Sequence, residues 1–283
     1  MLFYTLLIFI LTSEVRGQAA GRCPRPETIA PCQCRTRGPT IQVRCTNSLM
    51  GRITEAMDKL RQSVTEVDVL ILEDNNIPHL PSRAFGSVKI NRLFIENNRM
   101  MTIDRNAFAG VEDFLTELYI KESNLKSLPK DAIDFLYELR VFSIENSQII
   151  TMPQVTGLKK LKLFKIDGSK IRDIPARSLS DLPSLTYLHI CRSDLTKLDV
   201  GVLENLRYLV LANFTENQIS WVHPRAFRYF SGRIFSHFCI ALSFVLIKFV
   251  YIFAIFAVAR ILVERSLPSQ NEQNACENYA HAR

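Results

Sequence analysis

The sequence predicts an α/β solenoid, that is, a curved stack of short repeats with a parallel sheet along the inner side. Two features carry this prediction. An apolar skeleton recurs along residues 67–230 at steps of 21–25 residues, and four closely spaced cysteines precede its first copy. An internal period of this length is the sequence sign of a solenoid. Solenoids offer extended concave surfaces for binding, so a binding role is expected before a catalytic one.

The skeleton reads L-x-x-L-x-L-x-x-[N/S]-x-[I/L/M], and its first residue is counted here as position zero. Position zero falls at seven places: Val67, Ile90, Leu115, Leu139, Leu161, Leu185 and Leu206. The L-x-L portion alternates in and out, as a strand with one buried face requires. One short strand per repeat should therefore pair with the next. This pattern is that of a leucine-rich repeat, and the predicted architecture is a horseshoe with a parallel concave sheet.

Position eight is polar and is expected to be buried in the turn that leaves each strand. It is occupied in order by Asn75, Asn98, Ser123, Ser147, Ser169 and Ser193. An asparagine side chain offers two donors and an acceptor to the backbone, whereas serine forms fewer bonds. The sequence thus predicts a polar ladder that weakens from Ser123 onward.

The seventh repeat departs from the skeleton. Leu206, Leu209 and Leu211 fit, but Phe214 then falls at position eight and Asn217 arrives three residues late. A small outward loop is expected where the strand ends. The sequon Asn213-Phe214-Thr215 lies there, so N-glycosylation of Asn213 is predicted, with an unused sequon as the alternative.

The N-terminal region indicates secretion. Residues 1–17 form a predicted signal peptide, because an apolar stretch of about eleven residues precedes Val15-Arg16-Gly17. Residues 23–46 then hold Cys23, Cys32, Cys34 and Cys45, and residues 47–66 connect them to the repeats. Such a cluster implies two disulfides that cover the exposed flank of the first repeat. Zinc is the competing interpretation, but C-x-C is tighter than the usual C-x2-C spacing.

The cysteine block and the repeats together resemble the N-terminal cap and array of extracellular leucine-rich-repeat proteins over residues 23–227. This resemblance implies the pairs Cys23–Cys34 and Cys32–Cys45. Residues 29–34 and the stretch LEDNNIPHLPSRAF are most similar to arthropod secreted proteins of the group that contains the non-catalytic subunit of oplophorus-luciferin 2-monooxygenase. The resemblance implies a scaffold without light-producing chemistry.

The C-terminal region does not follow this resemblance, because no second cysteine cap follows Phe227. Residues 238–259 are apolar and, at about 1.5 Å per helical residue, long enough to cross a bilayer, with Lys248 in mid-span. A single transmembrane helix followed by a polar tail, residues 260–283, is the first interpretation. An altered C-terminus is the second, and a removed lipid-attachment tail is disfavoured by the polar residues that follow.

No catalytic, metal-binding or cofactor-binding motif is found, so the chain is predicted not to be an enzyme and to need no cofactor. The formal charge of +7 is spread without basic runs or interleaved aromatic residues, which argues against nucleic acid. Anionic glycans and lipid head groups remain open.

Positions two, four and six of each strand should point outward from the sheet and carry the binding function. Exposed aromatic residues beside charges are typical of binding hot spots, although a solvated strand face is the simpler alternative. Cys191 is also expected on this face, exposed. The predicted partner-binding residues are Phe94, Glu96, Tyr119, Lys121, Glu145, Lys165, Tyr187 and His189. We expect an extracellular or cell-surface module that binds a protein, or alternatively a scaffold subunit that stabilises a secreted enzyme.

Overall fold

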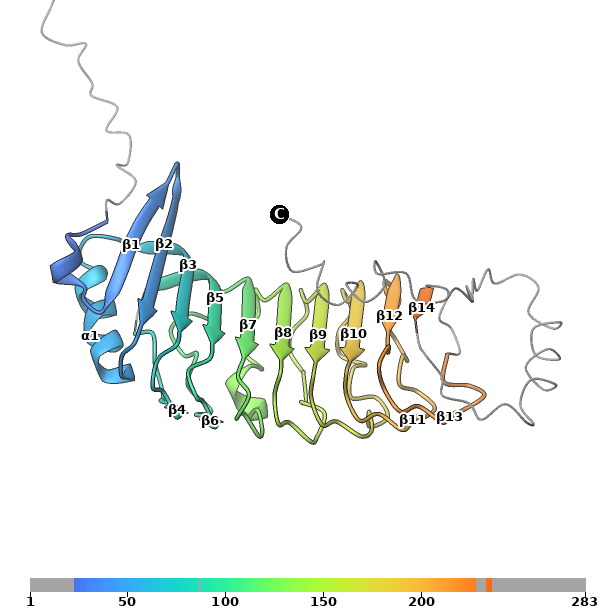
Figure 1. The fold of residues 1–283 in the computed structure, drawn as a ribbon. Helices are drawn as coiled ribbons and strands as arrows, with labels where there is room; N and C mark the ends of the chain where they lie inside the picture. The colour runs from blue at the N-terminus through green and yellow to red at the C-terminus, as the bar shows by residue number, and fades with distance from the viewer. Residues whose placement is uncertain (1–22, 87, 228–232, 236–283) are drawn as a thin grey trace, which may run out of the picture.

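A computed structural model describes residues 23–86, 88–227 and 233–235 of the chain (Figure 1). The predicted signal peptide, residues 1–17, lies outside the described residues, as do the candidate membrane helix at 238–259 and the polar tail at 260–283. Among the residues that are described, no helix has the length and apolar character needed to cross a bilayer.

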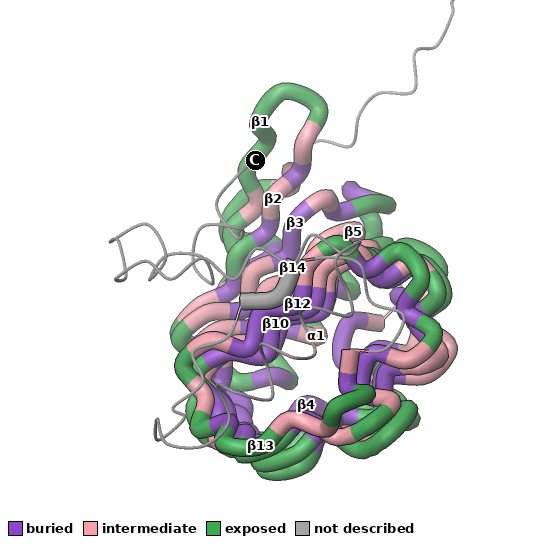
Figure 2. Tube along the Cα trace, turned by 90° about the vertical axis from the view of Figure 1, so that its right-hand side faces the viewer, coloured by how far each residue is buried: buried purple, intermediate pink, exposed green. Residues whose placement is uncertain are grey.

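The structure is a parallel-strand solenoid, as the period predicts. Its main sheet has ten strands, in the order β1-β2-β3-β5-β7-β8-β9-β10-β12-β14. Their bounds are β1 Cys32–Arg37, β2 Thr40–Thr46, β3 Glu66–Glu73, β5 Lys89–Glu96, β7 Glu117–Lys121, β8 Val141–Glu145, β9 Leu163–Asp167, β10 Tyr187–Cys191, β12 Leu211–Asn213 and β14 Arg233–Phe235. Among these described strands, only the β1–β2 pair is antiparallel. Viewed end-on, successive repeats overlay one another (Figure 2).

The outer side of the repeats is built from turns and short strands rather than α-helices. The solenoid is therefore mainly a β-structure, whereas the sequence predicted an α/β solenoid. On the outer side β4 (His79–Leu80) pairs with β6 (Thr102–Ile103), and β11 (Lys197–Leu198) pairs with β13 (Trp221–Val222). Within the described residues the one α-helix is α1 (Met50–Leu60), with short 3-10 turns at Pro26–Thr28 and Lys130–Ala132. Prolines recur in the outer segments and oppose helix there, because proline lacks an N–H and clashes with the preceding turn. They are Pro81, Pro129, Pro153 and Pro175.

One continuous apolar core runs along the solenoid, because no single repeat can bury its apolar face alone. Leu70 and Leu93 occupy equivalent places in adjacent strands, and both are fully buried. On the outer side the rings of Phe85 and Phe108 are stacked with centroids 6.0 Å apart. The buried side chains of each repeat thus rest on their counterparts in the next.

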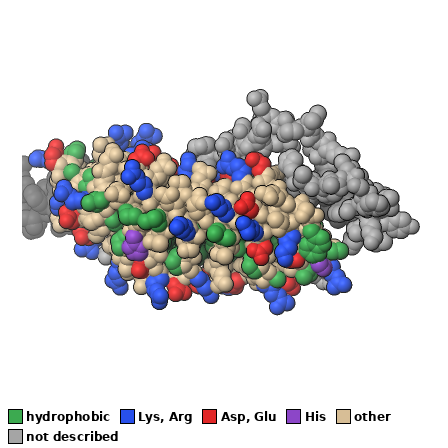
Figure 3. Space-filling model, turned by 60° about the horizontal axis from the view of Figure 1, so that its bottom comes forward, with side chains coloured by type: hydrophobic (Ala, Val, Ile, Leu, Met, Phe, Trp, Pro, Cys, Tyr) green, Lys and Arg blue, Asp and Glu red, His purple; other side chains and the backbone are tan. Residues whose placement is uncertain are grey.

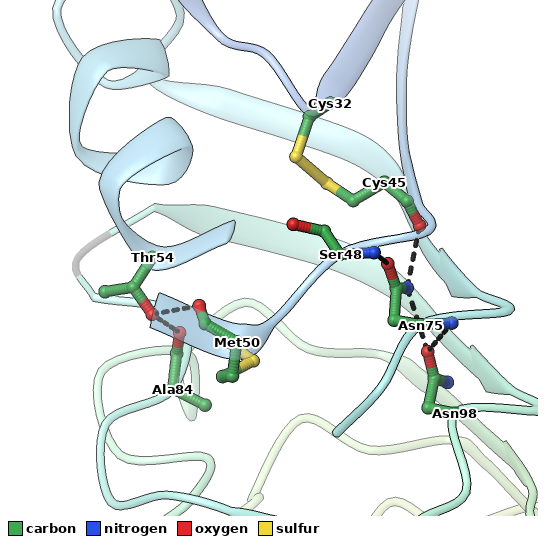
Figure 4. The surroundings of a disulfide bond; sticks show 8 residues. All are labelled: Cys32, Cys45, Ser48, Met50, Thr54, Asn75, Ala84 and Asn98. Atoms are coloured by element: carbon green, nitrogen blue, oxygen red, sulfur yellow. Dashed lines mark hydrogen bonds between the residues drawn. A yellow bond between two sulfur atoms is a disulfide. The ribbon is translucent and has the colours of Figure 1, made fainter. Parts of the chain in front are cut away.

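The N-terminal cap closes this core with two disulfides and a helix. Its disulfides join Cys23 to Cys34 and Cys32 to Cys45, the same pairs that the resemblance implies. Figure 4 shows the second of them. Helix α1 lies in the segment expected only to be a connection. Its apolar face is buried, and the Thr54 hydroxyl donates a hydrogen bond to the Ala84 carbonyl at 3.4 Å. The buried face comprises Met50, Ile53, Ala56, Met57 and Leu60.

The polar ladder begins as predicted, with asparagine side chains linking one repeat to the next. Asn75 Nδ2 donates to the Cys45 carbonyl and to Asn98 Oδ1, each at 2.9 Å (Figure 4). Asn98 Nδ2 donates in turn to the Leu72 carbonyl at 2.9 Å. These bonds satisfy backbone groups that the strand ends would otherwise leave buried without partners.

In the third repeat the prediction of Ser123 is wrong, because Glu122 takes the place in the ladder. Ser123 is exposed, whereas Glu122 is 1% exposed. One Glu122 carboxylate oxygen accepts bonds from Asn98 N and Nδ2 at 2.7 and 2.8 Å, and the other accepts from Met100 N at 3.1 Å. The sequence pattern missed this carboxylate because it lies one residue before the expected position.

The backbone at Glu122 also differs from that of the equivalent residues in the other repeats. Position seven of the other repeats has a left-handed conformation, with φ between 47° and 70°, but Glu122 is not among these residues. They are Asp74, Asn97, Asn146, Gly168, Arg192 and Glu216. In the third repeat the side chain at position seven therefore supplies the ladder acceptor instead of pointing away. Ser147, Ser169 and Ser193 are buried, as expected.

The seventh repeat begins at Leu209, not at Leu206, and the predicted outward loop is absent from it. Strand β12 places Leu211 beside Tyr187 and Asn213 beside His189, which fixes its register. Ala212 and Phe214 then fill the two buried strand positions at 0% exposure. Leu206 lies three residues before position zero of its repeat, just as Leu182 lies three residues before Leu185 in the sixth repeat. Leu182 and Leu206 are both buried in the core, so Leu206 resembles a position-zero residue in the sequence.

With this register Asn217 is the ladder residue of the seventh repeat. Its Nδ2 donates to the Ile190 carbonyl at 2.7 Å, as Asn98 does to Leu72 in an earlier repeat. The array is thus more regular than its sequence suggests.

Candidate binding surface on the concave face

The concave face consists of the side chains at positions two, four and six of the repeat strands. Because the strands are in register, each position forms a column across the sheet. Position four holds Ile71, Phe94, Tyr119, Ser143, Lys165, His189 and Asn213. This column changes from apolar and aromatic in the first repeats to polar and charged in the later ones.

Phe94 and Tyr119 form a preorganised aromatic pair in the second and third repeats of the column. Their rings are stacked, with centroids 4.5 Å apart and an angle of 4° between planes, and both are half-buried. The Tyr119 hydroxyl donates a hydrogen bond to Glu117 Oε2 at 3.1 Å. Burial, reinforced by the Glu117 charge and that hydrogen bond, raises the pKa of Tyr119, so the phenol remains a neutral donor. A partner would meet rings that are already ordered.

Acidic side chains flank the aromatic pair along position six. Glu73 and Glu96 are neighbours on β3 and β5. Burial raises the pKa of Glu96, with Lys121 opposing the rise and Glu73 adding to it. Arg44 of the cap binds Glu73 at 2.6 Å, so the first carboxylate of the column is partly compensated. Glu96 has no such short ion pair among the described residues, which leaves it for a cationic partner.

The charges of the fourth, fifth and sixth repeats instead compensate one another. Lys165 Nζ lies 2.8 Å from Glu145 Oε1 and 3.4 Å from Asp167 Oδ2. Arg192 Nε donates to Asp167 Oδ1 at 2.6 Å. Since Lys165 is 6% exposed and Asp167 is fully buried, this network mainly holds adjacent strands together. A buried ammonium must be paired, which accounts for its arrangement.

The sixth and seventh repeats bury three of their concave side chains, those of His189, Cys191 and Asn213. His189 is 3% exposed, and burial, aided by the charge of Lys165, lowers its pKa to about 4. Cys191 is fully buried, so its expected exposure is wrong. Asn213 is 1% exposed, and its Oδ1 accepts a hydrogen bond from Thr215 N at 3.0 Å. Glycosylation of Asn213 stays a prediction.

The eight predicted binding residues therefore divide into three sets. Phe94, Glu96, Tyr119, Lys121 and Glu145 lie on adjacent strands and are half-buried; they are called the aromatic patch below. Tyr187 is half-buried two strands farther on, whereas Lys165 and His189 expose little surface.

Two charged residues that the predicted set omitted border the aromatic patch. Arg92 and Glu117 lie side by side at position two of β5 and β7. The alternation of inward and outward side chains along each strand was sufficient to place both residues on the concave face. In the described part of the chain, no group of three or more His, Cys, Asp or Glu residues is arranged to hold a metal ion.

Comparison with known proteins supports the same fold. No protein-family model matches the sequence. The chain is 23% identical over 184 residues to the oplophorus-luciferin 2-monooxygenase non-catalytic subunit of Oplophorus gracilirostris, covering 63% of this chain and 50% of that protein. It is 27% identical over 174 residues to bovine (Bos taurus) lumican, covering 59% and 48%. Both relatives are leucine-rich-repeat proteins.

A crystal structure of a TLR13–ssRNA13 complex is similar in fold, with a TM-score of 0.59 and 19% identity. The similarity covers 69% of this chain and 28% of that chain. The chain spans about half the length of the two relatives, so these matches establish the repeat architecture and leave the activity of the whole proteins aside.

Proposed function

We propose that this chain, a leucine-rich-repeat protein with an N-terminal cysteine cap, is an extracellular binding module that engages a protein through its concave face. The observation that carries the proposal is the stacked Phe94–Tyr119 pair, held half-exposed between charged side chains. Aromatic residues that become desolvated on binding supply much of the affinity of protein interfaces. The remaining charges set specificity and association rate.

The charge of the aromatic patch indicates the kind of partner. Glu96, Glu117 and Glu145 surround the rings, with Lys121 and Arg92 beside them. Because Glu145 is already paired with Lys165 at 2.8 Å, the carboxylates that a partner can use are Glu96 and Glu117. A partner surface with an apolar centre and lysine or arginine at its rim would complement this arrangement. Burial already raises the pKa of Glu96, so a cation placed beside it would stabilise its charged form.

The test is a photocrosslink followed by a binding measurement. A photoreactive phenylalanine analogue replaces Phe94 in one sample and exposed Tyr137 in another. The partner is the protein captured only from position 94. Its affinity is then measured for the F94A/Y119A variant, for which we expect a loss of about 2 kcal/mol or more, that is, roughly 30-fold in Kd.

The matched control is F114A/Y137A, which also removes one phenylalanine and one tyrosine. Both residues lie outside the strands and are 36% and 56% exposed. This control should bind normally. If it loses as much affinity as F94A/Y119A, or if F94A/Y119A binds like the wild type, the concave face is not the binding surface.

A scaffold role is the second candidate function. The similarity to a protein named as a non-catalytic subunit favours it, although that similarity is 23% identity over half of the relative. A scaffold would co-purify with an enzyme chain in a fixed ratio and would raise the thermal stability of that enzyme. A partner without enzymatic activity would favour the simple binding module.

A further inference from the structure

The cap hairpin β1–β2 carries a basic face that neither the core nor the aromatic patch uses. The hairpin projects beyond the outline of the solenoid, and its tip is exposed (Figures 1 and 2). One of its faces is hollowed into a groove of about 330 Å³, called the cap groove below. Its lining consists of Gln33, Arg35, Arg37, Gln42 and Arg44.

Strand alternation explains why these side chains share one face. In the antiparallel register Gln33 lies opposite Arg44, and Arg35 lies opposite Gln42, so their side chains point the same way. The opposite face holds Val43 and Cys45, which are fully buried in the core. The core thus accounts for one face of the hairpin and leaves the arginines without a packing role.

The charge of the cap groove is of one sign. The hairpin sequence Cys32–Thr46 contains three arginines and no acidic residue. Arg44 is held by Glu73 at 2.6 Å, but among the described residues no ion pair is formed by Arg35 or Arg37. On the face shown in Figure 3, by contrast, basic and acidic side chains are interspersed.

The chemistry of the cap groove selects among polyanions. Arginine presents a planar fork that can bind sulfate, phosphate or carboxylate through two parallel hydrogen bonds. The two glutamine amides can both donate to and accept from hydroxyl groups. No aromatic side chain lines the groove, whereas surfaces for single-stranded nucleic acid rely on aromatic stacking.

We propose that the cap groove binds a linear sulfated polysaccharide, with Arg35 and Arg37 holding sulfate groups and Gln33 and Gln42 contacting sugar hydroxyls. The groove adjoins the concave face, because Gln42 and Arg44 are in register with Val69 and Ile71 of β3. A bound chain would therefore lie beside the partner surface without covering Phe94 and Tyr119. Only the supply of this ligand depends on the proposed extracellular location; the binding itself does not.

The experiment measures binding of size-defined heparin oligosaccharides to the full chain by calorimetry at several salt concentrations. The R35Q/R37Q variant should bind about tenfold more weakly at 0.15 M salt. The slope of log K against log salt should fall by about two, because two fewer charges are neutralised. N-desulfated and O-desulfated heparin of the same length should bind weakly or not at all.

The matched control is R105Q/R207Q, which removes two exposed arginines from other parts of the chain. It should bind heparin like the wild type, as should F94A/Y119A. Loss of heparin binding can therefore be told apart from loss of protein binding at the aromatic patch. The proposal is overturned if the wild type does not bind heparin at 0.15 M salt, or if R35Q/R37Q and R105Q/R207Q lose the same heparin affinity. Tighter binding of single-stranded DNA than of heparin would assign the groove to nucleic acid instead.

Discussion

Replacing Glu122 with alanine should strongly destabilise the protein. The carboxylate ends the asparagine part of the ladder, where it accepts hydrogen bonds from Asn98 N, Asn98 Nδ2 and Met100 N. It is 1% exposed, so water does not supply these bonds in its place. Removing it leaves the turn after β5 without its acceptor.

The expected magnitude follows from the donors that lose their partner. Asn98 Nδ2 keeps bonds to the Leu72 and Glu96 carbonyls at 2.9 Å, so its loss is small. The backbone N–H groups of Asn98 and Met100 remain buried, since both residues are fully buried. An unsatisfied buried donor costs about 1–3 kcal/mol, which gives a total of about 2–6 kcal/mol. This is a large part of the stability of a typical domain.

The assay is urea unfolding followed by circular dichroism, combined with hydrogen exchange of the Asn98 and Met100 amides. Ser123→Ala is the matched control, because the skeleton places Ser123 in the ladder whereas the structure exposes it. It should change the free energy of unfolding by less than about 0.5 kcal/mol. Glu122→Gln should fall between the two, since its amide keeps one acceptor oxygen and places N–H groups where an acceptor is needed.

The reasoning is refuted if E122A costs less than about 1 kcal/mol with both amides still protected. It is also refuted if S123A costs as much as E122A, because the ladder would then run through the serine.

Three further outcomes are expected. C32S/C45S should lower the free energy of unfolding by about 2–4 kcal/mol, and an unchanged urea midpoint would contradict this. His189 has a pKa lowered from 6.5 to about 4, so the unfolded state binds its proton first and stability is lost as pH falls through that window. H189Q should therefore lose less stability than the wild type between pH 6.5 and pH 4, and parallel losses would exclude the effect. For Asn213 the sequon predicts a glycan while the buried side chain opposes one, and intact masses of wild type and N213Q from secreting cells decide between them.

The aromatic patch was accessible from sequence because strand alternation is a local property. Phe94 and Tyr119 stand at the same position of consecutive repeats, so the period alone places them side by side. Their stacking at 4.5 Å and the hydrogen bond from Tyr119 to Glu117 depend on side-chain rotamers, which no repeat pattern specifies. Helix α1 could also have been found, since Ile53, Met57 and Leu60 have helical spacing.

By itself the sequence determined the repeat, its parallel strands and the buried residues of most repeats, because all of these follow from a period that each copy obeys. Tertiary structure decided what depends on contacts between copies. Pairing of β12 with β10 set the register of the seventh repeat at Leu209, where the leucine spacing permits two alignments. Packing likewise selected Glu122 over Ser123, because the Glu122 carboxylate reaches back and satisfies the backbone donors of Asn98 and Met100. Tertiary structure also decided that Lys165 is buried among carboxylates. A lysine at an outward strand position has the same local sequence pattern whether it is solvated or buried in an ion pair.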